Sequence, residues 1–200
     1  MQLIIEGMQS TFDNGDAEQL VALIQNTLQA AHRYYNYLIV DGRQISEPYA
    51  AYINEHFHEI EELELVGQSF EQLIYNNLAS AKAYLDRVQE KLPPLAERFY
   101  QIPEAADWQG FADFLQGIGW IGTLVEALKN VPDERMRAQS LISCYGALEQ
   151  KIDEMKDSVE ARDAVAMADA LTYELLPQID TLRRALVTML VREGEHHDQA

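Results

Sequence analysis

The sequence predicts an α+β protein, with a small N-terminal βαββαβ module followed by an antiparallel four-helix bundle. Two observations support this class. Four long segments between Ser69 and Val191 carry apolar residues at alternating spacings of three and four, which places one narrow stripe on each helix for burial against the others. Before Gly67 the pattern changes to short β-branched and aromatic runs bounded by turn residues, which is typical of strands.

These patterns divide the chain into three parts. Residues 1–66 form the α+β module, residues 67–193 form the helical bundle, and residues 194–200 form a polar tail that we expect to be disordered. A module of the first size is only marginally stable alone. We therefore expect the open face of its sheet to be covered, either by the bundle or by a second copy of the chain in a homodimer.

The elements of the N-terminal module follow from local signals. Asp41-Gly42 is a dipeptide that supplies the positive φ angles of a two-residue hairpin turn, and Pro48 suits the first turn of a helix. The βαββαβ order is that of the split βαβ, or ferredoxin-like, arrangement, in which two helices cover one face of a four-stranded antiparallel sheet. The predicted strands are residues 3–5, 34–40, 43–46 and 62–65, and the predicted helices begin at Asn14 or Asp16 and at Pro48.

Prolines delimit several of the bundle helices. Pro93-Pro94 should end the first helix, because proline removes a backbone donor and collides with the preceding turn; a short helical piece at 95–100 follows. Pro177 lies within the fourth segment and should kink or split it. The predicted helices are residues 69–92, 104–130, 133–160 and 162–191.

The charge of the chain restricts its partners. The sequence contains 33 Asp and Glu residues against 15 Lys and Arg residues, a net charge of −18. Residues 1–66 alone carry eleven acidic residues and two basic ones, Arg33 and Arg43. Such a chain repels phosphate backbones and anionic lipid, so we expect neither nucleic acid nor a membrane surface as partner, and a basic protein or peptide instead.

The distribution of apolar residues and cysteine indicates the compartment. No run of 18 apolar residues could span a bilayer, and residues 1–6 do not show the basic and apolar regions of a secretion signal. The single cysteine, Cys144, permits no internal disulfide, which fits a reducing environment. We therefore expect a cytoplasmic protein.

Three glycines in the second bundle helix give the sharpest motif. Gly117, Gly119 and Gly122 match the G-x-G-x-x-G spacing of dinucleotide-binding loops, but that motif follows a strand and needs an acidic residue about 20 positions later. Here the preceding residues are helical and Ile142 stands at that distance. We interpret the glycines as packing residues that let a neighbouring helix approach or Trp120 lie flat. The alternative is a bend that opens a pocket between helices.

Two histidine-containing segments raise the question of metal binding. They are Glu55-His56-Phe57-His58-Glu59 and Glu195-His196-His197-Asp198, each of which includes or adjoins the Glu-x-x-His spacing of di-iron bundles. That chemistry requires the pair to project inward from facing helices, and neither segment lies on a predicted core stripe. We interpret both as solvated surface residues, with a weak adventitious metal site as the alternative, and predict no metal or cofactor.

Clustered tyrosines raise the question of RNA binding, because βαββαβ is also the order of RNA-recognition motifs. Those domains need basic residues for the phosphates and aromatic residues on the third strand, and residues 43–46 carry no aromatic residue. Half-buried strand tyrosines explain the cluster, and a protein-contact surface is the alternative. The cluster comprises Tyr34, Tyr35, Tyr37, Tyr49 and Tyr52.

One segment of the last helix supports a family resemblance. The residues Asp163-Ala-Val-Ala-Met-Ala-Asp169-Ala-Leu-Thr-Tyr173-Glu-Leu-Leu-Pro177 resemble the last helix of acidic, uncharacterised proteins of Gram-positive bacteria. This resemblance implies a bacterial protein and no assigned activity. In size and charge the chain is also similar to flagellar and secretion chaperones, which are all-helical, so the mixed N-terminal module departs from them.

Together these observations predict a non-enzymatic cytoplasmic interaction protein, adaptor-like or chaperone-like, that binds an apolar or basic helix of a partner protein. The alternative is a bundle that binds a small ligand or catalyses a reaction in a pocket near Trp120. No catalytic motif identifies an active residue. The predicted pocket or partner surface comprises Trp108, Phe114, Gly117, Gly119, Trp120, Gly122 and Tyr145.

Overall fold

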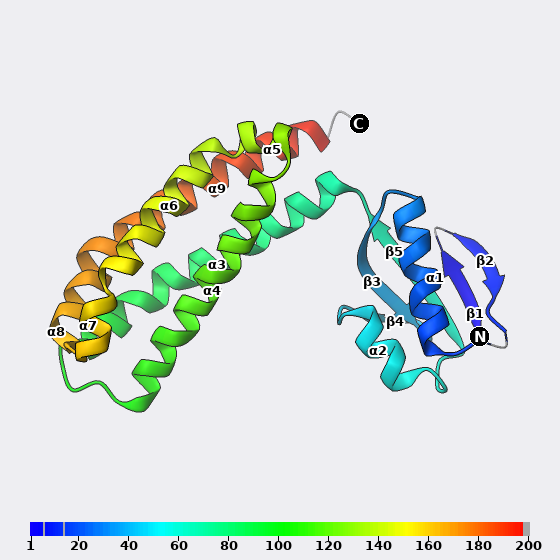
Figure 1. Cartoon of the computed structure of the whole chain (residues 1–200), viewed down its shortest axis with the longest axis horizontal. Coiled ribbons are helices and arrows are strands. Elements are labelled where there is room, and N and C mark those ends of the chain that lie inside the picture. The colour runs from blue at the N-terminus through cyan, green and yellow to red at the C-terminus, as the bar shows by residue number, and fades with distance from the viewer. Residues whose placement is uncertain (6, 14, 198–200) are drawn as a thin grey trace. The chain divides into compact units, whose positions relative to one another are not determined.

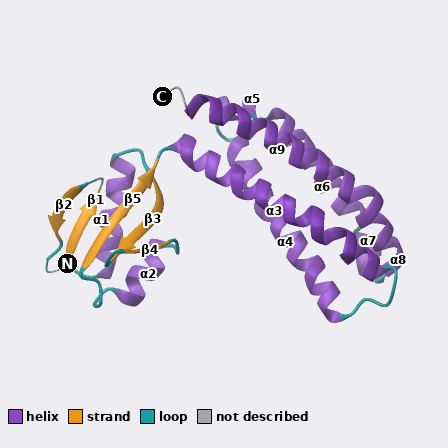
Figure 2. Ribbon diagram, turned by 180° about the vertical axis from the view of Figure 1, so that it is seen from behind, coloured by secondary structure: helices purple, strands orange, loops and turns teal. Residues whose placement is uncertain are grey.

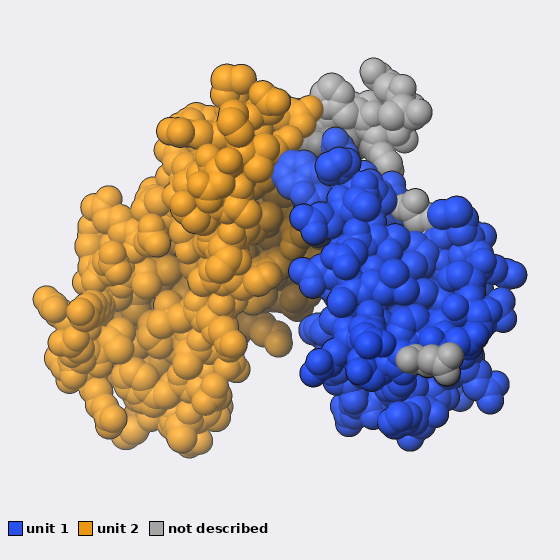
Figure 3. Space-filling model, turned by 45° about the vertical axis from the view of Figure 1, so that its right-hand side comes forward, with its two compact units in different colours: residues 1–74 blue, residues 75–200 orange. Residues whose placement is uncertain are grey.

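The computed structural model describes residues 1–5, 7–13 and 15–197. The predicted α+β class is confirmed, because strands and two helices precede a long helical region (Figures 1 and 2). The chain divides into two compact units, residues 1–74 and residues 75–200, which are coloured separately in Figure 3. This division falls after Ile74, whereas Gly67 lies within β5 (Glu62–Gln68).

The first unit contains a five-stranded mixed sheet in the order β2-β1-β5-β3-β4 (Figure 2). β1 pairs with β5 in parallel, whereas the other neighbouring strands are antiparallel. This sheet differs from the predicted split βαβ arrangement, which has four strands and is antiparallel throughout. The other strands are β1 (Gln2–Ile5), β2 (Met8–Thr11), β3 (Tyr34–Val40) and β4 (Arg43–Ile45).

The additional strand, β2, has a physical explanation. Gly7 has a φ of 78°, a conformation that glycine adopts without strain, and it lets the chain turn back so that Met8 pairs with Ile5. All four residues of β2 are exposed. The strand therefore shows no alternation of apolar and polar residues, which is the signal that identifies a half-buried strand in a sequence.

The predicted hairpin between β3 and β4 is present. Asp41 and Gly42 have φ angles of 49° and 78°, and Val40 pairs with Arg43 across the turn. The Asp41 side chain also accepts hydrogen bonds from the backbone N–H groups of Glu61 and Glu62, at 3.2 and 2.8 Å. The same aspartate therefore supplies the turn geometry and holds the start of β5.

The helices α1 (Ala17–Ala30) and α2 (Tyr49–His56) form a core with one face of the sheet. Asp16 caps α1, because its Oδ1 accepts from the N–H of Gln19 at 2.9 Å. Because side chains alternate across a strand, only one set of strand residues can face the helices. Leu3, Leu63 and Leu65 belong to that set. The buried core residues are Leu3, Leu20, Ile24, Leu38, Val40, Ile53, Ile60, Leu63 and Leu65.

The second unit is helical apart from its connections (Figure 1). Within the described residues no helix combines the length and apolar character needed to cross a membrane. The helices are α3 (Phe70–Phe99), which begins in the first unit, α4 (Ala105–Lys129), α5 (Pro132–Arg137), α6 (Gln139–Glu154), α7 (Lys156–Ala161), α8 (Ala164–Asp169) and α9 (Leu176–His197), with a π-helix, η1 (Ala170–Leu175), between the last two.

Polar contacts identify the neighbours of each long helix. The Tyr84 hydroxyl of α3 donates to the Phe114 carbonyl of α4 at 2.9 Å, and the Tyr145 hydroxyl of α6 donates to the Ile118 carbonyl of α4 at 3.4 Å. Lys151 of α6 forms an ion pair with Glu174 of η1 at 2.9 Å. Helix α3 contacts α9 through an ion pair and a side-chain hydrogen bond. By these contacts α3, α4 and α6 each touch two other segments, and their apolar stripes are buried as predicted.

The prediction that Pro93-Pro94 ends the first long helix is wrong, because α3 continues through both prolines to Phe99. Both prolines are exposed, so the carbonyl groups that lose their intrahelical donors can bind water. The apolar stripe continues past them through Ala96 and Phe99, which are buried. Burial of this stripe outweighs the loss of two backbone hydrogen bonds.

The last helical segment continues through Pro177, but its helix type changes just before the proline. The π-helix η1 lies immediately before it, and the N–H of Leu176 bonds the carbonyl of Leu171, five residues earlier. This wider turn accommodates a proline that cannot donate to the preceding turn. At its other end α9 continues to His197, so the prediction that disorder begins at residue 194 is wrong. No proline interrupts the helix there. Residues 198–200 lie outside the described part of the chain.

Candidate functional site

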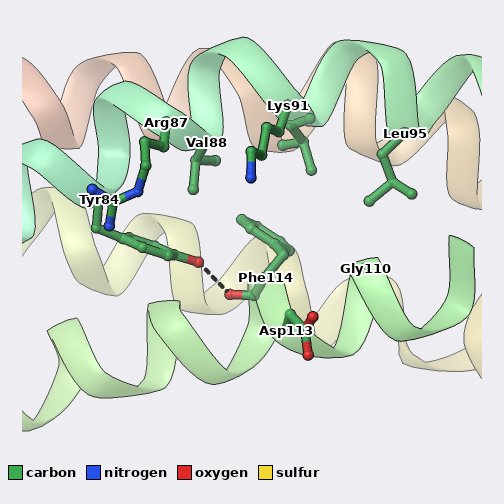
Figure 4. Close-up of a pocket in the computed structure, with 9 residues that line it drawn as sticks. Tyr84, Arg87, Val88, Lys91, Leu95, Gly110, Asp113 and Phe114 are labelled. Carbon is green, nitrogen blue, oxygen red and sulfur yellow. Dashed lines mark hydrogen bonds between the residues drawn. The ribbon is translucent and has the colours of Figure 1, made fainter. Parts of the chain in front are cut away.

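A pocket of about 320 Å³ lies between α3 and α4, partly open to solvent (Figure 4). Its residues come from one face of α3 and the first half of α4. Because α3 and α4 run antiparallel, Tyr84 lies beside Phe114 and Phe99 lies beside Trp108. The lining residues are Tyr84, Arg87, Val88, Lys91, Leu92, Leu95, Gly110, Asp113 and Phe114.

The inner surface of the pocket is apolar. Val88 and Leu92 belong to the buried stripe of α3, and Phe114 belongs to that of α4. Gly110 faces Leu95 across the pocket, and a Cβ atom added at Gly110 would make an ordinary contact of 3.6 Å with a Leu95 methyl group. Gly110 has no side chain to occupy the pocket, and a large side chain at this position would fill part of it.

Tyr84 forms one end of the pocket, and Gly117 makes room for it. A Cβ atom at position 117 would overlap the Tyr84 ring, so only glycine allows the phenol to lie against α4. In this position the hydroxyl donates to the Phe114 carbonyl. Desolvation by burial raises the pKa of Tyr84 to about 12, so the phenol remains a neutral donor at physiological pH.

Charged groups line the opening of the pocket. Arg87 and Lys91 project from successive turns of α3, and Asp113 projects from α4 (Figure 4). Asp113 accepts a hydrogen bond from Gln109 at 2.8 Å, and the Arg87 guanidinium lies 6.0 Å from the centre of the Tyr84 ring. Among the described residues, neither Arg87 nor Lys91 forms an ion pair. The opening therefore carries two cations on one wall and one carboxylate on the other.

The structure places the predicted site residues in several locations. Phe114 lines the pocket, and Gly117 admits the tyrosine at its end. Trp108 packs edge to face against Phe99, with ring centres 5.1 Å apart. Trp120 is 39% exposed, and the positions around it lie outside the α3–α4 pocket.

The other two predicted glycines differ from each other. A Cβ atom at Gly122 would overlap the hydroxyl of Tyr145, whereas at Gly119 it would meet nothing within 4 Å. Gly122 therefore admits Tyr145 of α6, as Gly117 admits Tyr84 of α3. The packing interpretation therefore applies to Gly117 and Gly122. It does not apply to Gly119, which no side chain approaches among the described residues.

Sequence reasoning missed the α3 side of the pocket. Tyr84, Arg87 and Lys91 have the same spacing of three and four as the buried stripe, displaced from it by one residue. Polar residues next to an apolar stripe ordinarily point to solvent, so this spacing alone is uninformative. The available signal was the pair of cations one turn apart in a chain of net charge −18.

A second feature of the unit is a set of exposed apolar side chains in η1 and in segments that contact or flank it, which we call the η1 patch: Tyr100, Ile102, Val165 and Tyr173. Tyr100 donates to Asp169 at 2.5 Å, and this hydrogen bond raises the pKa of Tyr100 to about 12. Tyr173 is close enough to add to the same shift. Ile102 follows Tyr100 by two residues, and Val165 lies one turn before Asp169 on α8.

The structure describes the side chains of one of the two histidine segments, residues 55–59. His56 contacts Glu59 at 3.4 Å in an exposed pair. Among the described residues no three His, Cys, Asp or Glu side chains lie close enough together to hold a metal ion. The side chains of His196 and His197 lie outside the part that the structure describes.

Comparison with known proteins gives one match. A family model described as Domain of unknown function (DUF8042) matches residues 76–185, more than half of the chain. No curated protein and no solved structure is significantly similar to it. The matched region contains both the α3–α4 pocket and the η1 patch.

Proposed function

The chain belongs to the family of the Domain of unknown function (DUF8042), and from this premise we propose that it is a non-enzymatic protein-interaction protein, adaptor-like or chaperone-like. In this proposal its helical unit is an antiparallel four-helix bundle that binds an apolar, basic segment of a partner protein. The partner contacts the η1 patch. A cytoplasmic location belongs to the same proposal and is supported by the single cysteine.

The exposure of the η1 patch is the observation that carries this proposal. Ile102 is 91% exposed, Tyr173 70% and Tyr100 44%. Large apolar side chains that gather on a surface are typical of protein-contact sites, and tyrosine is enriched there. Tyr173 also lies within a π-helix, an element that is rare overall but frequent at functional sites.

The charge around the patch favours a basic partner. Residues 97–107 and 151–174 together contain ten acidic residues and four basic ones. A partner with Lys or Arg residues flanking an apolar anchor would be attracted to this end of the unit. Added salt screens this attraction, so we expect it to lower the association rate.

Site-specific photocrosslinking in cells tests the proposal. A photoreactive phenylalanine analogue replaces Tyr173, and a matched variant carries it at Met136, which is 76% exposed on α5 at the opposite end of α4. We expect protein crosslinks from position 173 and none to the same partner from position 136. Mass spectrometry of the crosslinked peptide should show apolar residues flanked by Lys or Arg.

Two outcomes would contradict the proposal. Equal crosslinking of the same proteins from both positions would show non-specific contact, and an acidic crosslinked peptide would exclude the charge argument. A third variant at Trp120 tests the partner surface that the sequence predicts around Gly119. Crosslinks from position 120 without crosslinks from position 173 would move the interaction to that face of α4.

A further inference from the structure

We propose that the α3–α4 pocket binds a small amphiphile, with an apolar chain or ring and one anionic head group such as a carboxylate. This site is separate from the η1 patch and does not depend on the proposed partner. The apolar part would lie against Val88, Leu92 and Phe114, and the head group would lie beside Arg87 and Lys91.

The space between α3 and α4 is not filled by their own side chains. Side chains on facing helices normally interdigitate and leave few voids larger than a water molecule. Here a pocket of about 320 Å³ remains between α3 and α4, and Gly110 contributes no side chain to fill it. This volume is at the lower end of the range for small-molecule sites, and the apolar lining with a few polar groups is typical of them.

Two cations at the pocket have no ion-pair partner in the part of the chain that the structure describes. Four basic residues lie on α3, and two of them are paired: Lys82 with Asp86 at 2.6 Å and Arg98 with Asp107 at 3.9 Å. Arg87 and Lys91 form no ion pair among the described residues, although acidic side chains outnumber basic ones two to one in the chain. These two line the pocket.

The other polar groups determine the orientation of the ligand. The Tyr84 hydroxyl already donates to the Phe114 carbonyl, so its ring serves as an apolar wall. Asp113 on α4 would repel an anion. The head group should therefore lie on the α3 side, where Arg87 and Lys91 can each form a charge-assisted hydrogen bond with it.

Calorimetric titration of the full chain with octanoate tests the proposal, with octanol and octylammonium as neutral and cationic probes of the same length. We expect saturable binding of octanoate only. The double variant Arg87→Gln, Lys91→Gln should bind it at least about a hundredfold more weakly, because it removes two charge-assisted hydrogen bonds and each is worth about tenfold or more in affinity. Asp113→Asn should strengthen binding, because it removes a like charge.

Lys82→Gln is the matched control, since it removes one positive charge from the same helix outside the pocket. The Lys82→Gln variant should bind octanoate with the affinity of the wild type. Gly110→Leu should abolish binding by filling the space while the thermal transition is retained. Failure of octanoate to saturate the wild type, equal binding of octanol, or equal weakening by Lys82→Gln would each overturn the proposal.

Discussion

Tyr84 shows how one residue connects the packing of two helices to a pocket. Its ring fills the space above Gly117, and its hydroxyl donates to the carbonyl of Phe114. Burial raises the pKa of the phenol to about 12, because the charged phenolate would lose its hydration. The residue therefore stabilises the α3–α4 contact as long as it keeps its proton.

The pKa of Tyr84 predicts a loss of stability at alkaline pH. In the unfolded chain the phenol titrates near 10, and in the folded chain near 12, so the folded state retains the proton more strongly. The contribution of Tyr84 to the free energy of unfolding is fully present below about pH 10 and decreases as the pH rises towards 12. Urea unfolding at several pH values should show a smaller decrease over this range for Tyr84→Phe than for the wild type.

The control for this experiment is Tyr75→Phe, which removes a hydroxyl from an exposed tyrosine on the same helix. It should keep the alkaline decrease of the wild type. Near neutral pH, Tyr84→Phe should also lower the free energy of unfolding by about 1 kcal/mol through the lost hydrogen bond. An unchanged alkaline decrease in Tyr84→Phe would exclude Tyr84 as its source.

At the scale of elements, α4 combines glycines with opposite surroundings. Gly117 and Gly122 admit tyrosines from α3 and α6, whereas a Cβ atom at Gly119 would meet open space. The cost of glycine in a helix is the same at all three positions, about 1 kcal/mol relative to alanine. Only the packing differs between them.

This difference predicts opposite effects for two substitutions two residues apart. Gly119→Ala should raise the free energy of unfolding by up to about 1 kcal/mol, because helix propensity improves and nothing is displaced. Gly117→Ala should lower it by about 1–3 kcal/mol, because the new methyl group displaces the Tyr84 ring and its hydrogen bond. Urea unfolding monitored by circular dichroism measures both. The same sign for the two variants would contradict the packing argument.

The prolines of α3 predict a second effect at this scale. Pro94 is exposed inside a helix, where proline removes a hydrogen bond and crowds the preceding turn. Pro94→Ala should raise the free energy of unfolding by about 1–3 kcal/mol, less the entropy that proline removes from the unfolded chain. Pro103→Ala, outside the helices, is the control and should not increase stability. A less stable Pro94→Ala variant would show that the packing of α3 requires a proline-induced bend.

At the scale of the whole molecule, the sheet of the first unit has one face without helices. Ile4, Glu64 and Ile39 are register neighbours on β1, β5 and β3, and they alternate with Leu3, Leu65 and Leu38 of the core. They therefore project from the face opposite α1 and α2. A carboxylate lies in the middle of this apolar row.

The position of Glu64 predicts how self-association should depend on salt. A two-fold homodimer through this face would bring two acidic modules together, and salt would screen their repulsion. Sedimentation velocity should therefore show a monomer at low ionic strength and increasing dimer at high ionic strength. Glu64→Gln should shift the dimer to lower salt. A dimer that is equally stable or stronger at low salt would place the interface on the helical unit instead.

Local signals in the sequence determined much of the fold. The apolar stripes of the long helices, the cap at Asp16 and the hairpin at Asp41-Gly42 were predictable, because each depends on residues close together in the chain. The candidate site was predictable only in part. Phe114 and Gly117 were identified through their spacing, whereas the α3 residues beside them were not.

The tertiary structure decided everything that depends on contacts between distant residues. The parallel pairing of β1 with β5 joins segments almost sixty residues apart, and no local pattern specifies it. The passage of α3 through Pro93-Pro94 depends on the burial of Phe99 against other helices, which outweighs a strong local signal to stop. Arg87 and Lys91 became pocket residues only because α4 lies opposite them, since the surroundings of a side chain are set by the element that packs against it.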